Sequence, residues 1–156
     1  DVYKRQGEYD GFYHRFFFNS DSKRKVVSRL SYLYNEDFLA PGQRYEAAFD
    51  YLPLKEFMIG VGYTSTILNW DHAPKTELNV VTGTSRINFN PDLSINNLLQ
   101  YDNFSKSLGI NSRLQWEYKP GARFYFVVNQ TYLDERTGLT LQGLGTAVKL
   151  GGIFRF

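Results

Sequence analysis

Long segments in which apolar and polar residues alternate one by one run through most of the chain. In the clearest, residues 108–119, Leu114 and Trp116 fall on one face while Arg113 and Glu117 fall on the other. This period of two indicates a β-strand whose two sides meet different surroundings. About a dozen residues is long for a strand of a soluble sheet and suits a strand that crosses a bilayer at a tilt. No run approaches the roughly 18 apolar residues of a transmembrane helix, so any membrane crossing must use a sheet.

Eight other segments repeat this pattern less regularly, and the first of them carries aromatic residues on both faces. The expected strands are 9–18, 25–35, 43–51, 57–70, 77–90, 94–102, 108–119, 123–133 and 146–156.

The connections between these segments alternate in length. Short ones are expected at 19–24, 52–55, 90–93 and 120–122, and mostly longer ones at 36–42, 71–75, 103–107 and 134–145. Outer-membrane barrels have short turns on one side of the membrane and longer loops on the other. The predicted fold is therefore all-β, an antiparallel up-and-down transmembrane β-barrel with about nine strands in this chain.

The hairpin around Pro120-Gly121 allows a prediction of register. A three-residue loop would put Trp116 opposite Phe126 and Leu114 opposite Val128. Apolar side chains would then pack across one face. The same register sets two cations, Lys119 and Arg123, against each other at the turn.

The strand count and the first residues both predict that the chain is an incomplete piece of a larger barrel. Single-chain bacterial barrels usually have an even number of strands, so nine suggests missing upstream strands. Residues 1–6 resemble a read-through scar from sequencing adapters, and no signal peptide precedes the first strand. We expect residues 7–156 to be the C-terminal part of one outer-membrane barrel domain.

The composition argues against several classes of function. The 18 Lys and Arg residues nearly balance 16 Asp and Glu, which does not predict a nucleic-acid partner. Without cysteine, a disulfide framework and a Cys-ligated zinc site are excluded. The two histidines, His14 and His72, lie in separate segments, and no serine or acidic partner stands at a persuasive spacing. We therefore predict no catalytic residues, no metal site, no cofactor and no enzymatic activity.

The alternation assigns side chains to the two sides of the barrel wall. Charged residues expected to face the lumen are Arg29, Arg44, Glu46, Asp50, Arg86, Arg113, Glu117, Arg123 and Arg155. Aromatic residues expected to face the membrane are Tyr32, Tyr34, Phe49, Trp116, Tyr118, Phe124 and Phe126. The charges would either line a selective channel or neutralise one another in a narrow lumen, and their mixed sign favours neutralisation.

The C-terminal residues carry a motif with a specific spacing. Lys149 is followed two residues later by Gly151, and Phe154 and Phe156 stand at the third and fifth positions after that glycine. The motif resembles the C-terminal assembly signal of outer-membrane barrels. The resemblance implies a Gram-negative outer membrane, contact with its lipid, and recognition of the last strand by the barrel-assembly machinery through strand addition.

A second resemblance covers about the last 70 residues. It rests on the runs 90–94, 99–103, 111–121, 126–129 and 153–156, which read NPDLS, LQYDN, NSRLQWEYKPG, FVVN and IFRF. These resemble an uncharacterised barrel family in which the barrel follows a periplasmic domain similar to family 9 carbohydrate-binding modules. The resemblance implies a glycan partner that binds through an upstream domain absent from this chain.

Three hypotheses of function follow. The leading one is a non-enzymatic outer-membrane barrel that serves as anchor or passage for a periplasmic carbohydrate-binding region. The second is a diffusion porin or the terminal strands of a larger transporter. The third is a soluble, lipocalin-like ligand-binding barrel, which would differ from the other two by not partitioning into membranes.

Overall fold

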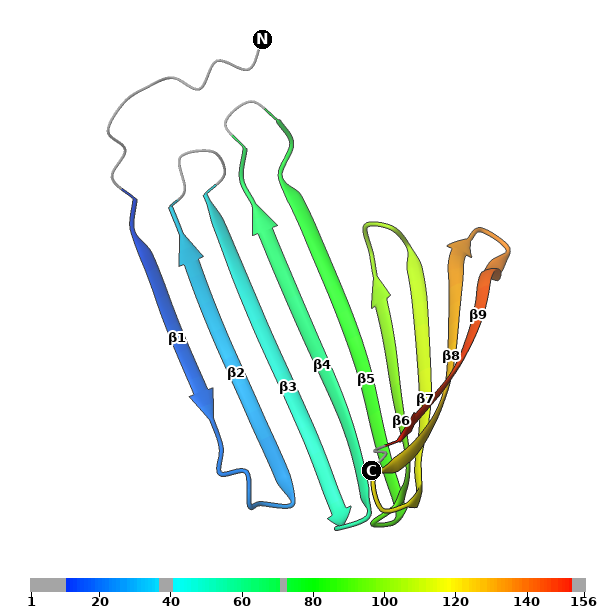
Figure 1. The fold of residues 1–156 in the computed structure, drawn as a ribbon. Coiled ribbons are helices and arrows are strands. Elements are labelled where there is room, and N and C mark those ends of the chain that lie inside the picture. The colour runs from blue at the N-terminus through cyan, green and yellow to red at the C-terminus, as the bar shows by residue number, and fades with distance from the viewer. Residues whose placement is uncertain (1–10, 37–40, 71–72, 153–156) are drawn as a thin grey trace.

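The computed structural model describes residues 11–36, 41–70 and 73–152, which form one sheet of nine antiparallel strands in sequence order (Figure 1). No helix occurs in these ranges, so the predicted all-β, up-and-down architecture is confirmed. The strands are β1 (Tyr13–Asn19), β2 (Val26–Asn35), β3 (Gly42–Leu54), β4 (Phe57–Leu68), β5 (Thr76–Asn90), β6 (Leu93–Asp102), β7 (Ser107–Lys119), β8 (Ala122–Glu135) and β9 (Gly138–Gly152).

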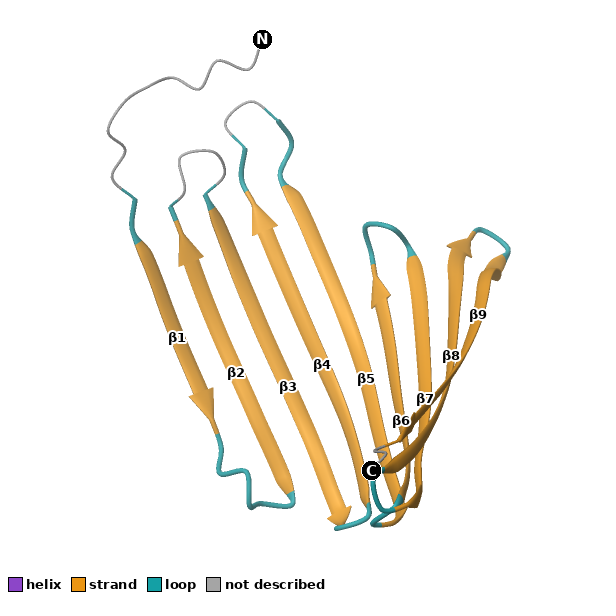
Figure 2. Ribbon diagram, in the orientation of Figure 1, coloured by secondary structure: helices purple, strands orange, loops and turns teal. Residues whose placement is uncertain are grey.

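The sheet is a single, open layer (Figure 2). Within the described residues β1 pairs with β2 alone and β9 with β8 alone, so the two ends of the sheet do not meet. Figure 1 shows β1 to β5 side by side as a broad wall, whereas β6 to β9 curl away from that plane. The nine described strands form an open sheet and do not by themselves close into a barrel.

Most strand positions agree with the sequence-based expectation, and the ninth strand is the main exception. Residues 134–145 were expected to form a long loop, which is wrong, because β9 begins at Gly138. Leu139 and Leu141 continue the apolar alternation toward the hairpin, and a register shift after Thr131 accommodates the extra residue. The connection is then Arg136 and Thr137, followed by Gly138 at φ 122°, a conformation that favours glycine.

The predicted register of the β7–β8 hairpin is wrong by two residues. Trp116 lies opposite Phe124 and Leu114 opposite Phe126, because the strands shift register between Glu117 and Lys119. The shift leaves the two faces of the hairpin unchanged. It places Glu117, rather than Lys119, opposite Arg123 and so replaces a predicted repulsion with an ion pair.

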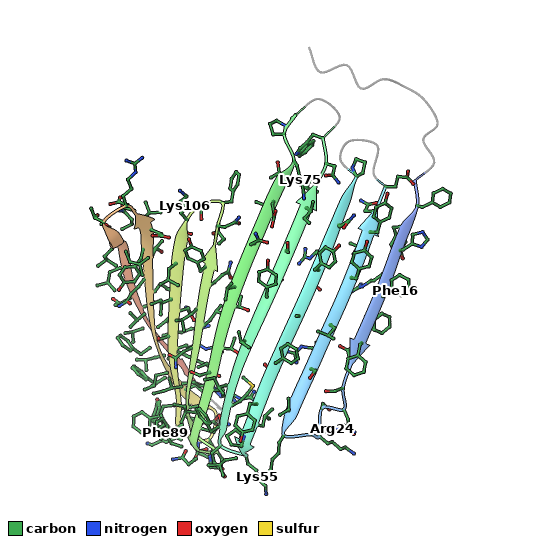
Figure 3. All side chains as sticks on the ribbon, turned by 180° about the vertical axis from the view of Figure 1, so that it is seen from behind. Phe16, Arg24, Lys55, Lys75, Phe89 and Lys106 are labelled. Atoms are coloured by element: carbon green, nitrogen blue, oxygen red, sulfur yellow. The ribbon has the colours of Figure 1, made fainter. Side chains whose placement is uncertain are left out.

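The connections alternate in length less strictly than predicted. At one end of the sheet, here called the turn end, three hairpins close through two residues each, but β1 and β2 are joined by residues 20–25. At the opposite end, the loop end, the links are 36–41, 69–75, 103–106 and 136–137. Figure 3 places Arg24 and Lys55 at the turn end and Lys75 and Lys106 at the loop end.

Almost no side chain of the sheet is buried. Val27 is the only buried hydrophobic residue in the described ranges, and no described side chain is fully buried. Soluble domains bury their apolar residues between two packed layers, which a single sheet lacks. The apolar side chains of this sheet therefore need a partner that the nine strands do not supply.

Candidate functional site: two faces of one sheet

The strand register sorts the side chains onto two chemically different faces. Directly opposed residues of antiparallel neighbours share a face, and successive residues along a strand alternate between faces. One face, here called the polar face, carries all eight described residues that were predicted to face a lumen. These are Arg29, Arg44, Glu46, Asp50, Arg86, Arg113, Glu117 and Arg123. Arg155, the ninth, lies outside the described residues.

The opposite face, here called the apolar face, carries the predicted aromatic residues. Tyr32, Tyr34, Phe49, Trp116, Phe124 and Phe126 share it by register, and Tyr118 by alternation. The rings of Trp116 and Tyr118 meet edge to face with centroids 6.0 Å apart. Phe49 is 44% exposed and Trp116 48% exposed, although both lie within strands. Large apolar side chains thus stand uncovered along the whole sheet.

Most charges on the polar face form ion pairs. Arg29 Nη1 lies 2.8 Å from Asp50 Oδ2, across β2 and β3. Arg44 Nη2 lies 2.7 Å from Glu46 Oε1 within β3, and Arg123 Nε lies 2.8 Å from Glu117 Oε2 across the β7–β8 hairpin. The predicted mutual neutralisation therefore accounts for six of the eight charges.

Glycines of β4 make room for the polar side chains beside them. A Cβ at Gly60 would overlap Asp50 Oδ1 and would lie 2.6 Å from Thr84 Oγ1, and a Cβ at Gly62 would overlap Thr82 Oγ1. The side chains of the neighbouring strands therefore lie over the β4 backbone. This role of Gly60 and Gly62 could not be found from alternation, because glycine fits either face.

A hollow of about 540 Å³ lies on the polar face across β1 to β5. Ala48 and Gly62, which have little or no side chain, leave this space, while Arg15, Arg29 and Glu46 contribute charge to its lining. Arg15 was missed from the sequence, because aromatic residues on both faces of β1 obscure its alternation. The polar face is thus the hollowed side of this part of the sheet.

Two tyrosines on the apolar face donate hydrogen bonds to polar side chains near the loop end. Tyr63 donates to Asn79 Oδ1 at 2.9 Å, and Tyr101 donates to Asp134 Oδ2 at 2.9 Å. A residue with an apolar ring and a polar tip suits a boundary between hydrocarbon and water. The loop end of the apolar face is therefore amphipathic.

One polar row crosses the middle of the apolar face. Ser85, Asn97 and Ser112 lie opposite one another on β5, β6 and β7, and Asn97 Nδ2 donates to Ser85 Oγ at 3.0 Å. This row was not predicted from the sequence. The side-chain amide of Asn97 thus makes a hydrogen bond to the neighbouring strand β5.

The C-terminal motif is described only in part. Lys149 and Gly151 lie in β9, where Lys149 faces Tyr125 and Gly151 faces Arg123 on the polar face. Phe154 and Phe156 lie outside the described residues. The proposed assembly signal therefore has its first half on the outermost strand of the sheet.

His14, the one histidine that the structure describes, lies apart from any cluster of metal-ligating side chains among the described residues. His14 stacks on Tyr34 with ring centroids 6.5 Å apart, and His72 lies outside the described residues. No group of three or more His, Cys, Asp or Glu side chains gathers within the described ranges. Over the same part of the chain, no helix is long and apolar enough to span a membrane.

No protein-family model, no curated protein and no solved structure matches the chain.

Proposed function

We propose that this chain forms part of the wall of a non-enzymatic transmembrane β-barrel in a Gram-negative outer membrane. The apolar face meets lipid and the polar face lines an aqueous lumen. The barrel serves as anchor or passage for a periplasmic carbohydrate-binding region. That last association rests on the sequence resemblance of the C-terminal strands alone.

The observation that carries the proposal is the difference between the two faces. Val61 is 55% exposed and Val148 63% exposed on the apolar face, and no second layer formed by the described residues covers them. In water such a surface would associate or aggregate. Lipid acyl chains can cover such an apolar surface, provided that the backbone N–H and C=O groups of the sheet are hydrogen-bonded to one another.

The hollow on the polar face favours a membrane barrel over a lipocalin-like one. A soluble ligand-binding barrel turns its apolar side chains inward, so its cavity would be lined by the apolar face. Here the hollow has a mixed lining, in which Arg15, Arg29 and Glu46 of the polar face place three charges beside apolar groups such as Phe17. A polar interior is typical of outer-membrane barrels.

The direction of the edge strands bears on how the barrel closes. Because consecutive strands alternate in direction, β1 and β9 both run from the loop end to the turn end. Joining them directly would make a parallel pair. Closure with antiparallel neighbours throughout needs an odd number of further strands between β9 and β1, and we include such strands in the proposal.

The proposal is tested by fractionating cells that express the complete gene product and by comparing its gel migration with and without heating. We expect the protein in the outer-membrane fraction, with migration that changes on heating because a closed barrel resists detergent until it is heated. A soluble protein whose migration ignores heating would contradict the proposal.

A further inference from the structure

Two predicted lumenal charges, Arg86 and Arg113, remain outside the ion pairs of the polar face. The ion pairs among the described residues are Arg29–Asp50, Arg44–Glu46 and Glu117–Arg123. Arg86 Nη2 lies 3.9 Å from Met58 Sδ, which is a weak acceptor. Both groups that have no ion-pair partner among the described residues are cations, so the three ion pairs do not bring the charge of the polar face to zero.

The strand register brings these arginines into one row. Arg86 on β5 lies opposite Asn96 on β6, and Asn96 lies opposite Arg113 on β7. With strands about 4.8 Å apart, the two arginine backbones are about 10 Å apart, with the amide between them. A group bound over Asn96 lies within reach of an extended arginine from each side.

The surrounding rows add another cation and several neutral hydrogen-bonding groups. The next row toward the turn end holds Asn88, Ser94, Gln115, Tyr125 and Lys149. In the row beyond, Glu117 faces Arg123 and pairs with it. Within the strands β5 to β9 these three rows hold four cations and one carboxylate, Glu117, which pairs with Arg123. Asp92, in the turn between β5 and β6, adds a second carboxylate beside Glu117, so the rows keep an excess of positive charge.

We infer that this patch, defined by Arg86, Asn96, Arg113 and Lys149, binds the oxyanion groups of anionic solutes in the lumen. The inference rests on the proposed function, because that function makes the polar face a lumen. Guanidinium groups bind carboxylate, sulfate and phosphate oxygens through paired hydrogen bonds, and the Asn96 amide supplies a neutral donor between them. The polar face of β1 to β3 has a smaller excess, because Arg15, Arg29 and Arg44 stand there against Glu46 and Asp50.

The patch also predicts a preference for anions in transport. Charged rings that line a pore favour the passage of ions of opposite sign. A lumen with this excess of positive charge near one end would pass anionic solutes in preference to cationic ones. The mixed-sign pairs elsewhere on the polar face contribute little net field.

Binding is tested by equilibrium dialysis of radiolabelled inorganic phosphate against the complete gene product in a non-ionic detergent at low salt. Arg86→Gln and Arg113→Gln each remove one charge-assisted interaction, and each should weaken binding about tenfold or more. Arg24→Gln, which makes the same change in the β1–β2 connection, should leave binding unchanged. Lys149 is left intact because it belongs to the proposed assembly signal.

Heat-modifiable migration of each variant reports folding and the proposed barrel independently of phosphate. Absence of phosphate binding to a heat-modifiable wild-type protein would overturn the inference while the barrel stands. An equal loss of binding in Arg24→Gln and Arg86→Gln would also overturn it. In planar bilayers under a KCl gradient, a conducting protein should favour chloride, and a preference for potassium would overturn the inference as well.

Discussion

The carboxylate of Asp50 on β3 occupies the space that a Cβ at Gly60 on β4 would fill. Arg29 on β2 holds the same carboxylate at 2.8 Å, and the Asp50 side chain is only 17% exposed. Thr84 Oγ1 on β5 borders the same space. One acidic side chain therefore connects three strands of the polar face and depends on the absence of a side chain on one of them.

Gly60→Ala should lower the free energy of unfolding by about 1–3 kcal/mol, because the new methyl group must displace Asp50 or the strand. Gly83→Ala is the matched control on β5, since a Cβ there meets only Leu99 Cβ at 3.8 Å. That control should be neutral or slightly stabilising, because alanine restricts the unfolded chain. Urea unfolding followed by tryptophan fluorescence measures both, and equal losses would contradict the account.

The Arg29–Asp50 pair should contribute more to stability than the Arg44–Glu46 pair. The side chains of Arg44 and Glu46 are 49% and 37% exposed, so their coupling energy should be at most about 1 kcal/mol. Asp50 is more buried, and its attraction to Arg29 is less screened by solvent. Double-mutant cycles on both pairs measure the two couplings, and the reverse order would show that burial of Asp50 has no energetic consequence.

Asn97→Leu should stabilise the folded protein in lipid by roughly 1 kcal/mol, because an apolar side chain replaces an amide on the face proposed to meet lipid. Asn96→Leu is the matched control, since the neighbouring residue lies on the polar face. There the same substitution should be neutral or destabilising. Unfolding in lipid vesicles compares the two, and greater stabilisation by Asn96→Leu would reverse the assignment of the faces.

The observed register of the β7–β8 hairpin can be tested with engineered disulfides, because the chain has no cysteine of its own. Leu114→Cys with Phe126→Cys should crosslink on oxidation, since these residues lie directly opposite each other. Leu114→Cys with Val128→Cys corresponds to the register predicted from the sequence and should not, because diagonal neighbours are too far apart. Mass spectrometry after oxidation reads the result, and preferential crosslinking of the second pair would contradict the structure.

Sequence alternation predicted the side of the sheet on which each residue lies far better than it predicted pairing. All eight described lumenal charges, Arg29 and Arg113 among them, fall on one face. A shift of register by two residues preserves the face of each side chain, so alternation cannot distinguish the observed β7–β8 pairing from the predicted one. The ion pair between Glu117 and Arg123 is the signal that favours the observed register.

The errors in the ninth strand and in β1 have different causes. In β9 the register shift puts Leu139 and Leu141 on the same face as Leu144, so the simple alternation is interrupted between Leu141 and Leu144. In β1, Phe17 lies on the polar face beside Arg15 and obscures the charged alternation. Alternation assigns each residue to a face of the sheet and does not determine whether the first and last strands pair, so the open edges of the sheet could not be predicted from it.

The most direct test of the central claim, that the two faces meet different media, compares cysteines at Val127 and Val128 on β8. These adjacent valines undergo the same substitution, and register places Val127 with Arg113 on the polar face and Val128 with Ser112 on the apolar face. Each single-cysteine variant of the complete gene product is folded into phosphatidylcholine vesicles and labelled with an environment-sensitive fluorophore. We predict quenching by brominated acyl chains for Val128→Cys and by aqueous iodide for Val127→Cys. Quenching of both labels by iodide alone would contradict a lipid-facing apolar face and with it the membrane barrel.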